Sequence, residues 1–217
     1  MKLPPIHADL LAARVIPNVD GALASQLDLN PNHRSLAMFT VTLDDVGVTA
    51  LDEATKRADV EVAYARSFYA GADHASGPLS GEFIGILSGP NPDEVKSGLD
   101  AAIQTVEYDA YFEALNDEKT HCLFAHVVAR TGSFLSKEAG IEQGEPLAYL
   151  IAPPLEAMYG LDAALKAADV QLVTFYGPPT ETNFGGGLLT GTQSACKAAA
   201  DAFRDSVMDT AQDPKRY

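Results

Sequence analysis

The stretch LDEATKRADVEV, residues 51–62, returns later in the chain as LDAALKAADVQL, residues 161–172. At a constant offset of 110 positions, seven of the first ten residues are identical. Chance would give about one such match in an alanine-rich chain, so the chain contains an internal repeat. This repeat predicts two domains of one fold, placed one after the other.

The repeated stretch carries a helix pattern followed by a strand pattern. Within residues 51–58, apolar and small side chains recur at i, i+3, i+4 and i+7, which predicts a helix whose Lys56 points away from the buried face. Thr49 and Asp52 have the spacing of a capping box. From Val60 onward the period changes to two, which predicts that the helix runs directly into a strand.

Each copy is predicted to be an α+β unit, with a roughly four-stranded antiparallel sheet and flanking helices. Residues 107–120 are expected to be a polar helix end and a linker. The predicted domains are therefore residues 1–117 and 118–217. The first copy is expected to hold strands at 12–19, 35–42, 60–65 and 82–88, and helices at 20–29, 51–58 and from Pro92, with Asn91 as N-cap. The second is expected to hold strands at 123–130, 147–152, 170–175 and around 188–189, and helices at 133–139, 161–168 and 194–210.

The two copies differ in length after the repeated strand. KSGLDA, residues 96–101, is answered by KAAADA, residues 197–202, at an offset of 101 instead of 110. The loop after the repeated strand is therefore expected to be nine residues shorter in the second copy, and loops that differ in this way are where repeated units specialise.

Composition excludes several classes of protein. The chain has 217 residues, a net charge of −15 and a pI near 4.5, which argues against a nucleic-acid or anionic-membrane partner. Two cysteines are too few for a secreted disulfide framework. The start of the chain lacks a signal-peptide pattern and no stretch is long enough to span a membrane, which predicts a cytosolic protein.

Several motifs resemble those of the bacterial microcompartment (BMC) shell domain family. DAALKAADVQL, GGGLLTG and KAAADAF match the helix, the Gly-rich strand and the closing Ala-rich helix of that domain. The order of the elements looks circularly permuted. RSFYAG, SGPNP, HVVARTGSFLS, APPLEAMYGLDAALK and PPTETN fit the tandem permuted shell proteins of ethanolamine utilisation. The chain is thus identified as a member of this family.

The resemblance implies a structural, non-enzymatic role. It implies a homotrimer whose six domains form a tile, packed beside other shell proteins around a compartment in the cytoplasm. It also implies a central pore with open and closed forms, and small pores that bind or pass ethanolamine. No catalytic cofactor is implied, although the parent pathway raises docking of cobalamin at the pore.

The resemblance also assigns roles to particular residues. Lys56 and Lys166 match lysines at the tile edge, although most lysines on such helices are simply solvated. The loop after the repeated strand matches a pore-closing loop, in which Tyr69 supplies bulk. The expected pore-loop residues are Ser67, Phe68, Tyr69, His74, Asn183 and Phe184.

Five residues are placed by the resemblance around ethanolamine. Asp45 and Glu82 would pair with the ammonium, with Asp44 as the alternative to Asp45. Phe112 would offer an aromatic face to the cation, and Thr182 a hydroxyl to the alcohol. Taken singly, each of these acidic residues is more often just solvated.

Other functions find less support. His121 and Cys122, with His74 or His126, invite a zinc site, but no metal-ligand spacing recurs. Gly185 to Gly187 is not a phosphate-binding motif, and no catalytic constellation is present. The alternative from another class is a duplicated small-molecule sensor or regulatory protein, which would stay a discrete oligomer.

Overall fold

The computed structural model describes residues 3–69 and 77–216, and its chain divides into two compact units. The N-terminal unit comprises His7–Ala110 together with Gly132–Leu135. The C-terminal unit comprises Met1–Ile6, Tyr111–Thr131 and Ser136–Tyr217. The predicted boundary at residue 117 lies just beyond the end of the first long segment.

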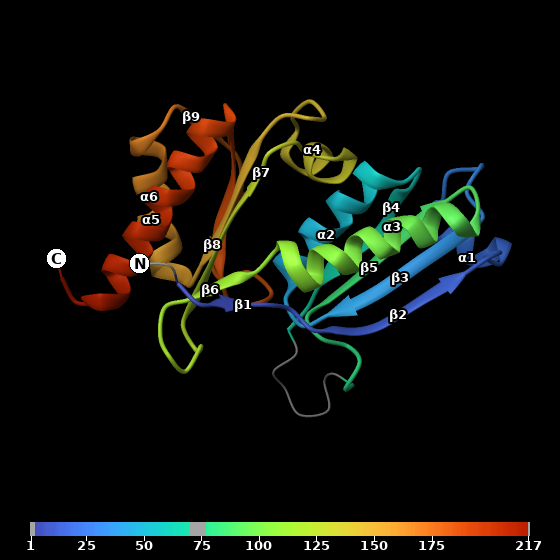
Figure 1. Ribbon diagram of the computed structural model, residues 1–217, viewed down its shortest axis with the longest axis horizontal. Coiled ribbons are helices and arrows are strands. Elements are labelled where there is room, and N and C mark those ends of the chain that lie inside the picture. The colour runs from blue at the N-terminus through green and yellow to red at the C-terminus, as the bar shows by residue number, and fades with distance from the viewer. Residues whose placement is uncertain (1–2, 70–76, 217) are drawn as a thin grey trace. The chain divides into compact units, whose positions relative to one another are not determined.

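The N-terminal unit holds an antiparallel sheet of four strands in the order β2-β3-β5-β4. Helices α2 and α3 lie side by side against this sheet (Figure 1). Their inward side chains pack on the central strands to form a buried core. The elements are β2 (Leu10–Ile16), α1 (Gly21–Gln26), β3 (Ser35–Val41), α2 (Asp44–Arg57), β4 (Glu61–Ser67), β5 (Phe83–Gly89) and α3 (Pro92–Gln104).

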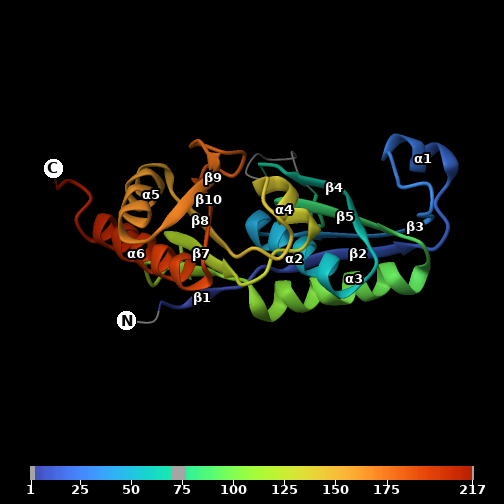
Figure 2. The ribbon, with the colours of Figure 1, turned by 90° about the horizontal axis from the view of Figure 1, so that it is seen from above.

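The C-terminal unit holds six strands in the order β1-β6-β7-β8-β10-β9. Helices α5 and α6 pack on each other and on this sheet (Figure 2). Two short strands are added to the expected four. The elements are β1 (Pro5–Ile6), β6 (Phe112–Ala114), β7 (Cys122–Val128), α4 (Ser133–Ala139), β8 (Leu147–Ala152), α5 (Pro154–Ala167), β9 (Val170–Tyr176), β10 (Gly185–Gly191) and α6 (Gln193–Gln212).

The predicted repeat is confirmed by the order of the strands. The order β2-β3-β5-β4 in one unit corresponds to β7-β8-β10-β9 in the other. The repeat extends to an irregularity, because Ala63 in β4 and Val173 in β9 are each skipped in the pairing with the neighbouring strand. These two bulged residues are 110 positions apart, the same offset as the repeated helix. A bulge bends its strand and increases its twist, so both sheets are shaped alike at this point.

The strand pairing shows at which places the second copy is shorter than the first. The bulges in β4 and β9 correspond at an offset of 110, whereas strands β5 and β10 correspond at 102, so eight residues are missing from the second copy between the bulge and β10. The N-caps of α3 and α6, Asn91 and Thr192, correspond at 101. The ninth residue is therefore missing from the turn between β10 and α6, and the loop does not account for the whole difference.

Helix α2 begins earlier than its pattern predicts. It starts at Asp44 instead of residue 51, and its N-cap Leu43 makes no side-chain capping bond. The predicted capping box of Thr49 and Asp52 is wrong, since Thr49 lies inside the helix and its hydroxyl donates to the carbonyl oxygen of Asp45, 2.8 Å away. Helix α5 likewise begins at Pro154 instead of residue 161.

The segment expected to be a linker is structured. After α3, residues Thr105–Asp109 form one turn of π-helix, and β6 follows it. Strand β6 pairs with both β1 and β7, which ties the N-terminal residues into the C-terminal unit. The prediction for α3 itself is confirmed, because the Asn91 side chain accepts from the backbone amides of Asp93 and Glu94.

Candidate functional site

An acidic cluster forms where β3, α2 and β5 meet in the N-terminal unit. Asp44 and Asp45 occupy the first turn of α2, where the partial positive charge of the helix end stabilises carboxylates. Glu82 directly precedes β5, and its backbone amide donates to the carbonyl oxygen of Val41, 2.9 Å away. Val41 is the last residue of β3, three positions before Asp44. The sheet therefore holds Glu82 beside the start of α2.

Two glycines make this close approach possible. Gly81 has φ +64°, and a Cβ there would lie 2.1 Å from the carbonyl oxygen of Val41. In α2, a Cβ on Gly47 would lie 2.3 Å from Cδ1 of Phe83, the residue after Glu82. Any larger side chain at either position has to move the turn or the helix. These glycines thus allow α2, β3 and β5 to pack closely beside the carboxylates.

The surroundings of Glu82 affect its protonation. Burial, and then the negative charge of Asp44, raises the pKa of Glu82 to about 6. Asp45 is buried as well. A cation that entered the cluster would relieve the repulsion between Glu82 and Asp44, so the arrangement favours a small ammonium.

Phe112 and Thr182, the other residues predicted for the ethanolamine site, belong to the C-terminal unit. Phe112 is buried in β6, with its ring centroid 5.1 Å from that of Phe124 and 6.0 Å from that of Phe184. Thr182 lies in the loop between β9 and β10, where its Oγ1 is 3.4 Å from Oγ1 of Thr180. The grouping of all five residues around one ligand stays a prediction.

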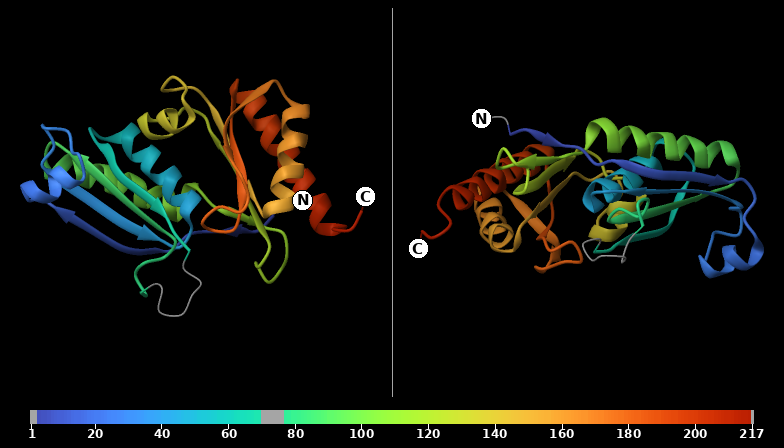
Figure 3. Two further views of the ribbon diagram at one scale, coloured as in Figure 1. Left: turned by 180° about the vertical axis from the view of Figure 1, so that it is seen from behind. Right: turned by 90° about the horizontal axis from the view of Figure 1, so that it is seen from below.

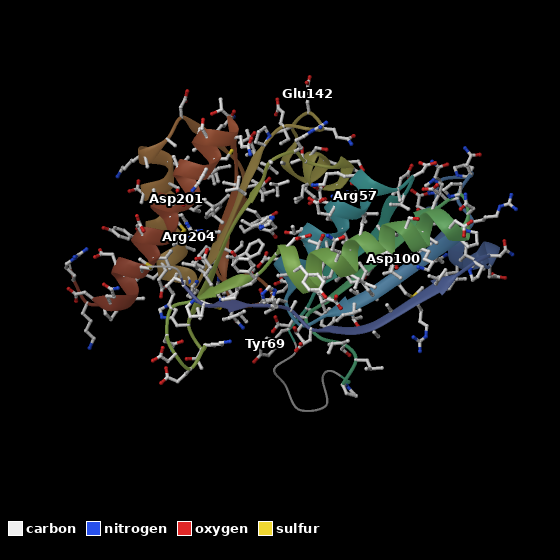
Figure 4. The ribbon with its side chains drawn as sticks, viewed as in Figure 1. Arg57, Tyr69, Asp100, Glu142, Asp201 and Arg204 are labelled. Atoms are coloured by element: carbon white, nitrogen blue, oxygen red, sulfur yellow. The ribbon has the colours of Figure 1, made fainter. Side chains whose placement is uncertain are left out.

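The predicted pore loops lie at the ends of the repeated strands. Ser67 ends β4, the amide of Phe68 donates to the carbonyl oxygen of Glu82, and Tyr69 is exposed. Figure 4 places Tyr69 at the end of the described chain after β4. His74 lies outside the described residues. The loop of Tyr69 is therefore tied through its first residues to the acidic cluster.

In the C-terminal unit the corresponding loop closes on itself. The amide of Asn183, which has φ +68°, donates to Thr180, and the amide of Thr180 donates to Phe184. The Phe184 ring then meets Phe112 edge to face. The role of both loops in closing a pore remains a prediction.

The two predicted edge lysines have different surroundings. Lys166 is 75% exposed and pairs with Asp162 at 2.6 Å. Lys56, at the matching position, is only 19% exposed and pairs with Asp52 at 3.3 Å and with Glu53. The expectation that Lys56 points outward is therefore not met, because its side chain folds back onto its own helix. The edge role of both lysines remains a prediction.

Asp52 has a structural role that the sequence pattern did not reveal. Its carboxylate accepts hydrogen bonds from the backbone amides of Gly132 and Leu135, both at 2.8 Å. The amide of Ser133 donates to Oγ1 of Thr55, one helical turn further along α2. Helix α2 thus caps the first turn of α4 from outside. Because Gly132 lies 80 positions from Asp52, local sequence patterns do not predict this cap.

A second missed pair lies in the C-terminal unit. The guanidinium of Arg204 binds both carboxylate oxygens of Glu113, with donor–acceptor distances of 2.7 to 2.9 Å, and also reaches Asp201. Figure 4 shows Arg204 and Asp201 on the same helix, α6. Glu113 belongs to β6, so this pair fixes the added strand to α6. Ile103 occupies the matching position of α3, which signals that the two copies diverge here.

Residues 3–69 and 77–216 contain no group of three or more His, Cys, Asp or Glu side chains placed to hold a metal ion. None of the helices described is long and apolar enough to cross a membrane.

Comparison with known proteins gives a consistent result. The BMC domain family profile matches residues 35–116. The chain is 56% identical to the bacterial microcompartment shell protein EutL of Clostridium perfringens, over 99% of both chains, and 53% identical to that of Salmonella typhimurium, over 96% of this chain and 95% of the other. The crystal structure of the ethanolamine utilization protein EutL from Leptotrichia buccalis superposes with a TM-score of 0.96, at 61% identity, over all of both chains.

Proposed function

The chain belongs to the EutL family of bacterial microcompartment shell proteins, and on that premise we propose that three copies assemble into a six-domain tile of the shell. The family membership confirms the predicted structural, non-enzymatic role. The observation that supports the tile is the shared strand order of the two units, β2-β3-β5-β4 and β7-β8-β10-β9. Three such chains supply six similar units, and a ring of three closes with only one kind of contact between chains.

We propose further that the tile binds and passes ethanolamine. At neutral pH this ligand is a small ammonium with one hydroxyl group. The cluster of Asp44, Asp45 and Glu82 carries the negative charge that such a cation requires. Burial and the charge of Asp44 raise the pKa of Glu82, so a bound ammonium would stabilise its ionised form. The same charge disfavours anions, so the tile would discriminate between charged metabolites.

The gate of the central pore is assigned to the loops that follow β4 and β9. Tyr69 is an exposed aromatic residue at the start of the longer loop, and Phe68 beside it is tied to Glu82. We propose that ligand in the acidic cluster is sensed by this loop through that backbone bond. The stretch between the repeated strand and the next strand is eight residues longer in the first copy, so we expect the loop of Tyr69 to supply more of the gate.

Electron microscopy of the concentrated protein tests the tile. A shell tile is expected to form extended hexagonal sheets, with a spacing set by the trimer. A discrete oligomer that never forms sheets would instead support the sensor or regulatory protein. Calorimetry with ethanolamine then tests the ligand separately, because a tile that forms sheets without binding ethanolamine would retain only the structural part of the proposal.

A further inference from the structure

A hollow of about 490 Å³ lies between α6 and β7 in the C-terminal unit. Figure 3 shows α5 and α6 side by side on one face of the C-terminal sheet, and α6 packs on β7. Strand β6 pairs with β7 only at Cys122 and Leu123, so it lies beside only the first residues of β7. The volume is typical of a site for a small molecule. The hollow is lined by Val127, Gln193, Ser194, Lys197, Ala200, Asp201 and Arg204.

The corresponding helix of the first copy carries larger apolar side chains at this place. At the offset of 101 that relates the N-caps of α3 and α6, Leu99 corresponds to Ala200 and Ile103 to Arg204. Leu99 is buried, and an alanine in its place leaves room beside the strand. The side chain of Arg204 is held by Glu113, at one end of the hollow. The hollow thus results from two residues that differ between the copies.

Other parts of the surroundings are the same in both copies. In the floor of the hollow, Val127 occupies the register position that Val15 occupies in β2. Each helix also carries one exposed pair of a lysine and an aspartate four residues apart, namely Lys96 with Asp100 at 2.6 Å and Lys197 with Asp201 at 2.8 Å. The first copy therefore supplies a control in which the same ion pair stands beside a larger apolar side chain.

Positive charge exceeds negative charge among the lining side chains, which include two cations, Lys197 and Arg204, and one anion, Asp201. Nε and one N–H of Nη2 of Arg204 bind Glu113, and one N–H of Nη1 binds Asp201. One N–H on Nη1 and one on Nη2 are left among the described contacts, and these two form the parallel pair that suits a phosphate or carboxylate. Because Glu113 and Asp201 already hold the guanidinium in place, a ligand would not have to order it.

We propose that this hollow binds a small organic anion. Lys197 and Arg204 hold its phosphate or carboxylate group, and its apolar part lies on Val127 and Ala200, where burial of apolar surface adds to the affinity. The site is separate from the acidic cluster of the N-terminal unit, because it lies in the other unit and takes a ligand of the opposite charge. It therefore depends neither on the tile nor on the binding of ethanolamine.

Calorimetry with four probes tests the chemistry of the ligand. Hexyl phosphate and hexanoate share one apolar chain, and the one that binds more tightly identifies the charged group that the site prefers. Inorganic phosphate is expected to bind at least about tenfold more weakly than hexyl phosphate, because it has no apolar part to bury. Hexanol, which has no charge, is expected to show no measurable binding. The proposal is overturned if neither organic anion binds, or if hexanol or inorganic phosphate binds as tightly as they do.

A matched pair of lysine variants tests the place of binding. Lys197→Ala is expected to weaken the binding of the tighter anion about tenfold, because the ligand loses a charged donor. Lys96→Ala removes the corresponding lysine of the first copy, which has the same kind of ion pair with Asp100, and is expected to leave the affinity unchanged. Both lysines are exposed, so both variants are expected to fold. Equal affinities of the two variants would contradict the assignment to this hollow.

A third variant tests the hollow itself. Ala200→Leu introduces the residue that the first copy has at the corresponding position, and its larger side chain is expected to fill the hollow and abolish binding of both organic anions. Circular dichroism and the urea midpoint show whether this variant is folded, since Ala200 is buried. A folded Ala200→Leu that binds the anions as tightly as the wild type overturns the proposal. If the variant does not fold, the comparison of Lys197→Ala with Lys96→Ala decides alone.

Discussion

The carboxylate of Asp52 accepts a hydrogen bond from the backbone amide of Leu135, 83 positions further along the chain and 2.8 Å away. The same carboxylate accepts from Gly132, and it is buried together with both donors. A single acidic side chain of α2 thus satisfies two amides of the first turn of α4 that have no partner within their own helix. This arrangement gives Asp52 a far larger role in stability than its repeat partner.

Replacement of Asp52 by Ala is expected to lower the free energy of unfolding by about 2–4 kcal/mol, because two buried amides lose a charged acceptor. Asp162→Ala is the matched control. Its side chain is 57% exposed and pairs only with Lys166 among the described contacts, so the expected loss is below about 0.5 kcal/mol. Urea midpoints measured at one protein concentration compare the two, since assembly adds to apparent stability. Equal losses in both variants would refute the capping role.

Ethanolamine binding is expected to weaken as the pH falls through about 6. An ammonium requires the ionised form of Glu82, whose pKa is raised to about 6 in the free protein. Between pH 7 and pH 5 the ionised fraction, and with it the affinity, should fall about tenfold. Glu82→Gln should bind about tenfold or more weakly at pH 7 and lose this dependence. Calorimetric titrations at the two pH values provide the measurement, and an unchanged affinity for the variant would contradict the assignment.

Glu82 should also affect stability in the absence of ligand. Because its pKa is raised from 4.5 to about 6 on folding, its protonation stabilises the folded state fully below about pH 4.5, and this contribution is lost as the pH rises through about 6. Glu82→Gln should therefore be more stable than the wild type at pH 7.5, by about 1 kcal/mol once the partial exposure of the group is allowed for. The difference should vanish near pH 4. Denaturation curves of both proteins across this pH range provide the measurement. A difference in the free energy of unfolding that does not change with pH would show that the charge of Glu82 does not cause it.

Gly81→Ala is expected to damage both the fold and the site. The left-handed backbone alone costs about 1–2 kcal/mol for alanine, and the Cβ contact with the Val41 carbonyl adds to it. Gly140→Ala is the control, since Gly140 has the same φ of +64° but nothing within 4 Å of an added Cβ. The control should lose only the backbone contribution and should bind ethanolamine normally. If both variants unfold at the same denaturant concentration, the close contact at Gly81 is without consequence.

Local patterns predicted the repeated parts of the fold well. The helix beginning at Pro92 is capped by Asn91 as expected, and the strand pattern after Asp59 appears as β4. These features depend on residues a few positions apart, and the same pattern in the second copy supports each prediction. The start of α2 was missed because Val46, Gly47 and Val48 are weak helix formers, and their helical state depends on packing against β5.

Features that depend on distant residues could not be predicted in this way. Strand β6 has three residues, and it is a strand only because β1 and β7 pair with it on either side. The burial of Asp52 depends on Gly132 and Leu135, and the pair of Arg204 with Glu113 joins residues 91 positions apart. None of these partners stands at a helix or strand period from the other. Asp44 and Glu82, in contrast, were assigned to the ligand site by the family resemblance, and their role there remains a prediction.

The bulges at Ala63 and Val173 indicate which features of the chain are older than its internal duplication. An extra residue at the same place in both copies is most simply inherited from a single ancestral unit, so it is older than the duplication. The difference in length between the two loops, the capping contact made by Asp52 and the Arg204 pair are not shared by the two copies, so the copies diverged at these places after the duplication. The form of the sheet was thus established while the ancestor still had one domain. Duplication then gave two identical halves that could diverge in function.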